Sequence, residues 1–282
     1  RYTNGNNTGI RIMGVFQNNL LAGAGGQAAG AAGFYSYQVE QSVRFENAST
    51  SRLSRTAGTP TNVDKYTFST WFKFVDVTST TSQLFLYHGE SSSSSYDSVY
   101  HRMSDNGQLR FQAQDGGTSY EVWSNKLYRD TNGFSHIMVV YDSAQSTASD
   151  RVKIFHNGVQ VTLDQSRYSG FPAQNRNALM NTSGATQNIG NGQTYGGSID
   201  GYFAETLFFD GQAYSPSDVT ETKNGVLIPK DPSSLTFGNN GFHLKYENAS
   251  DLGNDSSGNN NDFTASGLGT DHQVLDSPTF GS

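Results

Sequence analysis

Apolar and polar side chains alternate along much of the chain, and the clearest example is the segment 66–74, which reads Tyr-Thr-Phe-Ser-Thr-Trp-Phe-Lys-Phe. Successive side chains of a strand point to opposite faces, so this alternation predicts a half-buried strand. One face would carry Tyr66, Phe68, Phe72 and Phe74, and the other Thr67, Ser69, Trp71 and Lys73.

Further short segments, each bounded by Gly, Asn, Asp or Ser, predict additional strands. The strongest local signal is Asn157-Gly158 between two alternating runs, because both central residues of a type I′ turn need positive φ. This pair predicts a hairpin over 151–162. Pro216 to Glu221, with Ser215 as its cap, predicts the one helical turn. The other predicted strands are 84–88, 109–114, 120–123, 134–141, 201–209 and 242–246.

Composition supports an all-β chain rich in loops. The 282 residues contain 31 Gly, 12% aromatic and only 15% charged residues, which excludes a coiled coil. The aromatic residues supply apolar area that a disordered chain lacks. Short strands with turn signals between them are typical of a sandwich rather than of βαβ units.

Charge and cysteine content exclude several classes of function. The formal net charge of −7, with no cluster of Lys and Arg, argues against a nucleic-acid partner. No apolar run is long enough to span a bilayer, so we expect no membrane insertion. Zero Cys excludes disulfides, thiolate metal sites and Cys nucleophiles, and favours a microbial or viral origin.

Three regions follow from changes in composition along the chain. Residues 1–42 include the Ala/Gly stretch 22–33, which is either a flexible linker or an arm that orders against a partner. Residues 43–231 are predicted to form one β-domain. Residues 232–282 are predicted to form a last strand followed by an Asn/Gly-rich extension.

Several of these segments, in this order, resemble laminin-G-like, concanavalin A-like domains. Ser42-Val-Arg-Phe-Glu-Asn47 with Arg52-Leu-Ser54 looks like the opening strand pair. The segments 66–74, 152–161 and 200–219 resemble the later strands and the closing turn. The resemblance implies an antiparallel jelly-roll sandwich of two sheets.

A narrower resemblance links residues 14–22, 54–56, 224–226 and 240–262 to virion proteins of marine and cyanobacterial tailed phages. It implies a structural or adhesive protein on the virion surface, such as a tail fibre, an appendage or a capsid decoration. Residues 14–42 would contact other virion proteins, and the chain would form a homo-oligomer and bind a host-surface glycan. The alternative is a secreted bacterial, lectin-like module that binds carbohydrate with the help of Ca²⁺.

No constellation of catalytic residues stands out. Laminarinase-type jelly rolls carry carboxylates on one face of a strand, whereas Asp200 and Glu205 would point to opposite faces of a continuous strand. Neither a nucleophile elbow nor a zinc-protease or P-loop motif is present. The six His are scattered. We therefore expect no enzyme.

A loop near the C-terminus offers hard oxygen ligands. Asp251, Asp255 and Asp262, with Asn259, have the donor type that Ca²⁺ takes, although the spacing is not that of an EF-hand. The alternative is a solvated turn whose side chains accept hydrogen bonds from their own backbone.

Glycan binding uses aromatic rings near strand ends or in loops, since sugar C–H faces stack on them. The candidates are Tyr87, Tyr96, Trp123 and Tyr195, and each could instead pack in the core. Tyr195 is the first choice because Gly192, Gly196 and Gly197 flank it.

Overall fold

The computed structural model describes residues 33–47, 51–75, 83–102, 107–165, 168–192, 197 and 199–279. Contacts divide the chain into two units, Arg1–Gln38 and Val39–Ser282. In the first unit, the rings of Phe34 and Tyr35 pack edge to face at 5.1 Å. Most of the predicted N-terminal arm, including the Ala/Gly stretch up to residue 32, lies outside the described residues.

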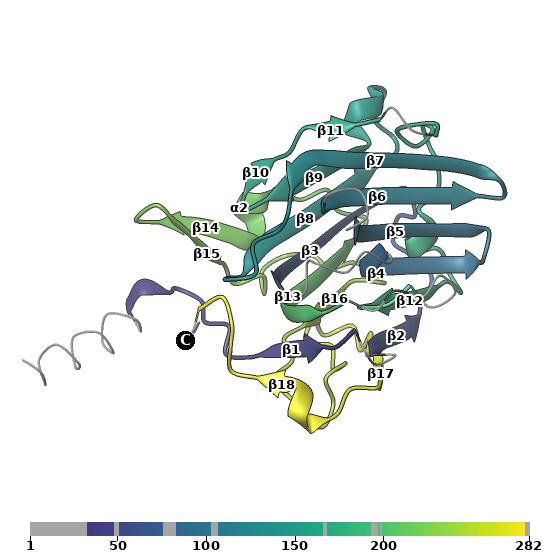
Figure 1. Cartoon of the computed structure of the whole chain (residues 1–282). Helices are drawn as coiled ribbons and strands as arrows, with labels where there is room; N and C mark the ends of the chain where they lie inside the picture. Colours follow the sequence, from purple (N-terminus) through teal and green to yellow (C-terminus); the bar gives the residue numbers. More distant parts are fainter. Residues whose placement is uncertain are drawn as a thin grey trace, which may run out of the picture. The chain divides into compact units, whose positions relative to one another are not determined.

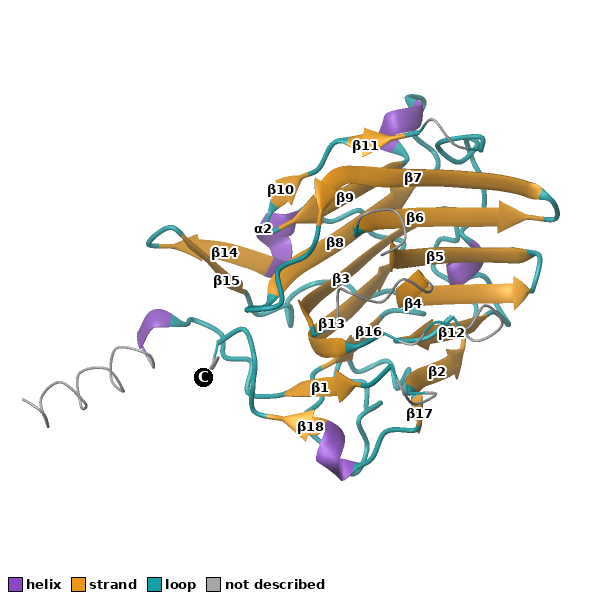
Figure 2. Cartoon of the chain, in the orientation of Figure 1, coloured by secondary structure: helices purple, strands orange, loops and turns teal. Residues whose placement is uncertain are grey.

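The second unit contains two large antiparallel sheets, which confirms the predicted all-β sandwich of jelly-roll type (Figures 1 and 2). The first sheet has the order β10 (Val159–Gln160), β9 (Val152–His156), β8 (Ser135–Asp142), β3 (Lys65–Phe74), β13 (Gly201–Asp210), β1 (Ser42–Phe45) and β18 (Gln273–Val274), and β16 (Phe242–Leu244) also pairs with β13.

The second sheet has the order β11 (Leu163–Asp164), β7 (Thr118–Leu127), β6 (Gln108–Asp115), β5 (Ser95–Arg102), β4 (Gln83–Ser92), β12 (Thr186–Ile189), β2 (Arg52–Thr56) and β17 (Thr264–Ser266). A separate hairpin, β14 (Thr220–Lys223) with β15 (Val226–Pro229), projects from the sandwich in Figure 1.

Aromatic rings fill the space between the two sheets. Tyr66 stacks on Tyr141 with centroids 5.2 Å apart, and Phe68 stacks on Tyr87 at 5.0 Å. The four apolar residues that the pattern placed on one face of 66–74 all belong to this core. The inward face of β3 was therefore predicted correctly.

The outward face of β3 is buried as well, so the prediction of a half-buried strand was wrong. Thr67, Ser69 and Trp71 are each less than 10% exposed. The reason is that the chain after β13 folds back over this face, where Tyr214 packs on Phe209 at 4.9 Å. A second cluster forms there, made of Met138, Val140, Leu207, Phe209, Val219 and Phe237.

Two local predictions are confirmed. Asn157 has φ 49° and Gly158 has φ 77°, and His156 pairs with Val159, as a type I′ hairpin requires. The helical turn is α2 (Pro216–Val219), which begins after Ser215. The Asp218 carboxylate accepts the Ser215 backbone N–H at 2.7 Å, which satisfies a donor at the helix start.

Residues 232–279 contribute strands to both sheets. β16 pairs with β13, β18 pairs with β1, and β17 pairs with β2. The predicted strand 242–246 is thus found as Phe242–Leu244. Contacts join this region to residues 39–231 in one unit, so the Asn/Gly-rich segment is part of the sandwich.

Candidate functional site

The aromatic residues singled out for ligand binding do not come together in one accessible site. Tyr87 is fully buried, and its stacking on Phe68 makes it a core residue, so that prediction was wrong. Tyr96 is 6% exposed, with its ring 5.6 Å from that of His88, and is also too buried to present a platform. Trp123 is half-buried against the Arg110 guanidinium. Tyr195 lies outside the described residues.

Polar side chains form a closed network on the face of β4 to β7 that carries Trp123. Arg110 forms a buried ion pair with Glu121 at 2.6 Å, and the Tyr100 hydroxyl donates to the same carboxylate at 2.8 Å. Burial, and then the negative charge of Glu121, raise the pKa of Tyr100. His88 bonds Ser98 Oγ at 2.7 Å through its Nδ1. Because the groups are buried and bonded to one another, this network holds the strands together.

The predicted calcium loop uses its carboxylates as hydrogen-bond acceptors. Asp255 accepts backbone N–H bonds from His243 and Asn261 at 2.8 and 2.9 Å, and Asp262 accepts the N–H of Asp255 at 2.8 Å. Asp251 is exposed. Within the described ranges, no group of three or more His, Cys, Asp or Glu is placed to hold a metal ion. This geometry matches the alternative to a calcium site, which was a turn whose side chains accept hydrogen bonds from its own backbone.

The argument that set Asp200 and Glu205 on opposite faces fails, because a bulge interrupts the alternation of side chains in β13. Glu205 has φ 47°, and the pairing with β3 shifts between Ala204 and Leu207. This bulge adds a residue and changes the alternation. Asp200 pairs with Arg44 at 2.8 Å, whereas Glu205 is buried against His243 Nε2 at 2.8 Å.

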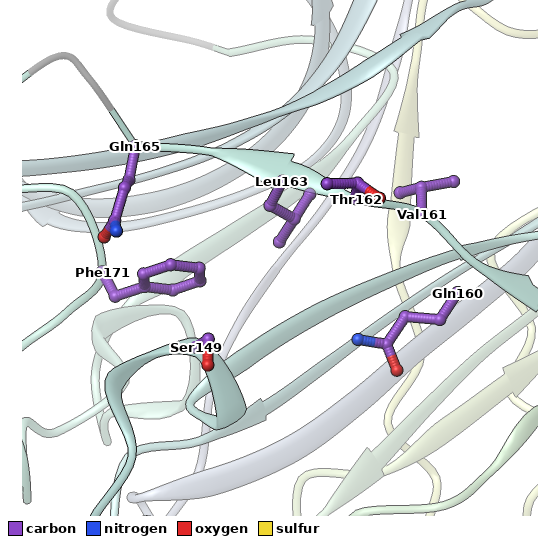
Figure 3. A pocket seen from close by; sticks show the side chains of 7 residues that line it. All are labelled: Ser149, Gln160, Val161, Thr162, Leu163, Gln165 and Phe171. Carbon is purple, nitrogen blue, oxygen red and sulfur yellow. The ribbon is translucent and has the colours of Figure 1, made fainter.

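An accessible pocket of about 390 Å³ lies where the chain crosses from one sheet to the other (the edge pocket; Figure 3). β10 ends at Gln160 in the first sheet, and β11 begins at Leu163 in the second. Two backbone bonds fix the crossing, since the Val161 N–H donates to Ile154 O at 2.9 Å and the Asn125 N–H donates to Thr162 O at 3.1 Å.

The lining of the edge pocket combines apolar groups with neutral hydrogen-bonding groups. Phe171 and Leu163 provide apolar groups, and the amides of Gln160 and Gln165 and the hydroxyls of Ser149 and Thr162 provide polar groups (Figure 3). Of the described lining residues, none is charged. The full set is Ser149, Gln160, Val161, Thr162, Leu163, Gln165 and Phe171.

Sequence reasoning did not find this pocket. The alternation of residues 151–162 predicts a hairpin but does not show where the second strand leaves its sheet. Phe171 comes from a different loop, and its ring is 9% exposed. A distance between these segments depends on the packing of two sheets, which no local pattern records.

The structure is that of a two-sheet β-sandwich protein with an accessible pocket at one edge. Residues 46–220 match the concanavalin A-like lectin/glucanases superfamily, and the chain belongs to this family. No curated protein matches the chain. Among the described residues, no helix is both long and apolar enough to cross a bilayer.

Comparison with solved structures gives matches at low sequence identity. A heptameric SAP-like pentraxin from Limulus polyphemus is 14% identical, with 64% of this chain and 80% of that chain covered and a TM-score of 0.45. Domain 4 of an extracellular arabinanase from Geobacillus stearothermophilus, in complex with arabinotriose, is 18% identical over 55% of this chain and 64% of that chain, with a TM-score of 0.41.

A tailspike protein from an Escherichia coli bacteriophage is 12% identical over 63% of this chain, with a TM-score of 0.43. The match spans 23% of the tailspike chain. At these identities the similarity concerns the fold alone.

Proposed function

We propose that this chain is a non-catalytic carbohydrate-binding protein that attaches to a surface polysaccharide through the edge pocket. The observation that supports the proposal most is the lining of this pocket in a sandwich of the lectin/glucanase superfamily. Amides and hydroxyls exchange hydrogen bonds with sugar hydroxyls, and the half-buried side chain of Leu163 offers an apolar surface to sugar C–H groups.

The size of the edge pocket is consistent with an oligosaccharide. Its volume of about 390 Å³ falls within the range of roughly 300–1,000 Å³ that is usual for small-ligand sites. Gln160, Thr162 and Gln165 are exposed, so a ligand can reach their polar groups from solvent. A neutral sugar unit suits the described lining residues, because none of them carries a charge.

We further propose that the protein acts on the outside of a tailed-phage particle, as a tail fibre, an appendage or a capsid decoration. Residues 14–42 would attach it to other virion proteins, and several copies on one particle would raise a weak single-site affinity through avidity. The resemblance of residues 14–22 and 240–262 to phage virion proteins supports this location. The alternative is a secreted bacterial lectin-like module with a Ca²⁺-assisted site.

Glycan binding is tested with an array of neutral and acidic glycans, followed by calorimetric titration of the bound ones. Gln160→Ala and Thr162→Ala are expected to weaken binding by roughly tenfold each, because each removes a hydrogen-bonding group from the pocket. Thr264→Ala is the matched control, since Thr264 is an exposed residue of β17 near the other edge of the second sheet.

The results separate the two candidates. Binding that survives a chelator supports the edge pocket, and binding that a chelator abolishes supports the Ca²⁺-assisted alternative. The absence of binding to any glycan, or an equal effect of Thr162→Ala and Thr264→Ala, would overturn the proposal. Release of shortened sugars from a bound glycan, followed by mass spectrometry, would show that the protein is an enzyme instead.

The location is tested by a mass-spectrometric inventory of purified virions. We expect peptides of this chain in intact particles, at a copy number typical of a repeated structural protein. Its presence only as free protein in infected cells would contradict a role on the particle.

A further inference from the structure

A second pocket, of about 230 Å³, lies at the same edge of the sandwich and differs from the first in its charge (the hairpin pocket). The end of β7 and the loop after it provide Lys126, Tyr128 and Arg129. The tip of the β9–β10 hairpin provides His156 and Asn157. The chain as a whole carries a net charge of −7, whereas this small pocket is lined by two cationic side chains, Lys126 and Arg129.

A hydrogen bond and a ring contact hold Lys126 of the hairpin pocket in place. Lys126 Nζ donates to His156 Nδ1 at 2.7 Å and lies 5.8 Å from the centre of the Tyr128 ring. An ammonium group has three donors, so this single bond leaves others for a ligand. The rings of Tyr128 and His156 pack edge to face at 4.9 Å. The rigid aromatic base therefore presents Lys126 in a defined position.

One acidic side chain, Asp130, also lines the hairpin pocket. Its Oδ1 accepts the Asn132 backbone N–H at 2.9 Å, so this carboxylate is bonded within its own turn. Burial, and then the nearby charge of Lys126, lower the pKa of His156 to about 4. His156 is consequently neutral at pH 7 and can accept the bond from Lys126. Of the described lining residues, Lys126 and Arg129 are the cations and Asp130 is the anion.

The two pockets are neighbours, since both are lined by residues on or next to β7 and the β9–β10 hairpin. Leu163 of the edge pocket pairs with Ser124 in β7, and Lys126 follows two residues later in that strand. At a rise of about 3.3 Å per residue, Lys126 lies roughly 7 Å along β7 from that pair. On the other side, Gln160 of the edge pocket pairs with Phe155, next to His156.

We propose that the hairpin pocket binds the anionic substituent, a carboxylate or a sulfate, of an acidic glycan whose neutral part contacts the edge pocket. The proposal rests on the glycan-binding function proposed above. Lys126 forms charge-assisted hydrogen bonds to the anionic group, and Arg129 adds positive charge to the same pocket. The ligand class is thus an acidic polysaccharide rather than a neutral one.

The test uses an array that presents neutral, carboxylated and sulfated forms of the same glycan backbones. Each bound acidic glycan is then titrated calorimetrically, and a carboxylated one is compared with its carboxyl-reduced form. Lys126→Gln and Arg129→Gln remove exposed side chains, so both variants are expected to fold. Arg52→Gln is the control, because it removes one positive charge from β2, near the opposite edge of the second sheet.

We expect the array to retain acidic glycans and each of the two variants to weaken binding by roughly fivefold to tenfold, with no change for Arg52→Gln. Carboxylated and sulfated glycans are separate arms, and the arm that binds identifies the substituent. Retention of neutral glycans with equal strength, or acidic binding that Lys126→Gln leaves unchanged, overturns this inference and leaves the proposed function standing. A lack of binding to every glycan overturns both.

Discussion

Asp210 at the end of β13 is a buried carboxylate that accepts four hydrogen bonds. Its side chain has no exposed surface. It accepts backbone N–H bonds from Thr61, Asn62 and Asn240 at 2.6, 3.2 and 3.1 Å, and a side-chain N–H bond from Asn181 at 2.7 Å. One residue therefore joins three loops that are far apart in the sequence.

Replacement of this carboxylate is expected to destabilise the protein strongly. Asp210→Asn would turn an amide NH₂ toward groups that are themselves donors, so at least one buried N–H would lose its partner. We expect a loss of about 2–4 kcal/mol in the free energy of unfolding, measured by urea denaturation.

Asp271→Asn is the control for this measurement, because that carboxylate is 84% exposed. Its unfolding free energy should change by less than about 0.5 kcal/mol. Equal stability of the two variants would show that the Asp210 bonds contribute little.

The β9–β10 hairpin is the element that borders both pockets. Its turn depends on Gly158, whose φ of 77° places it in the left-handed region. A Cβ at this position would lie 3.4 Å from Leu227 Cδ1, an ordinary contact, so the cost of a side chain is conformational rather than steric.

Gly158→Ala is therefore expected to reduce the unfolding free energy by about 1–2 kcal/mol. Gly133→Ala serves as the comparison, since Gly133 has no positive φ and open space around its Cα. Denaturant midpoints of the two variants check the prediction. A midpoint for Gly158→Ala at or above that of Gly133→Ala would contradict it.

At the scale of the whole molecule, residues 232–279 provide strands and core side chains to the sandwich. Phe242 and Leu244 are fully buried in the main core, and β18 covers the edge of β1. A chain ending at residue 231 would lack these residues and would expose the core side chains that they cover. We expect it to lose cooperative thermal unfolding and near-UV circular dichroism.

Removal of residues 1–38 is the matched truncation, because contacts place them in a separate unit. That truncation is expected to leave the melting temperature of the remaining chain unchanged. A cooperative transition in the chain ending at residue 231 would show that the C-terminal strands are dispensable.

Buried histidines predict a loss of stability in acid. Burial is the main reason that the pKa of His136 is lowered to about 3 and the pKa values of His101 and His156 are lowered to about 4. The pKa of a histidine in an unfolded chain is about 6.5. Below pH 6.5 the unfolded chain therefore binds more protons than the folded chain does. The free energy of unfolding is highest above that pH and decreases as the pH drops toward 4. His156 contributes less because its ring is partly exposed.

Calorimetric melting temperatures between pH 7.5 and 4.5 test this dependence. We expect His136→Gln to flatten the decline, even if the variant is less stable at neutral pH, and His272→Gln to keep it, since His272 is partly exposed. A decline that is unchanged in His136→Gln would assign the acid sensitivity to other groups.

The amino-acid sequence by itself determined the features that depend on local interactions. The alternation of residues 66–74 placed four rings on the inner face of β3, and Asn157-Gly158 set the hairpin turn, because side-chain direction and φ preference act within a few residues. The same kind of information predicted the strands of a sandwich and the capped turn at Pro216, whereas the two-sheet jelly roll followed from the family resemblance.

The tertiary structure alone decided which surfaces a ligand can reach. Tyr87 and Tyr96 occupy positions that look like strand ends in the sequence, yet the packing of two sheets buries both. The bulge at Glu205 changes the direction of a side chain by adding one residue to a strand. Both pockets are lined by more than one segment of the chain, such as Gln160 and Phe171 in the edge pocket and Lys126 and His156 in the hairpin pocket. Contacts of this range depend on how the sheets are stacked, which no pattern along the chain encodes.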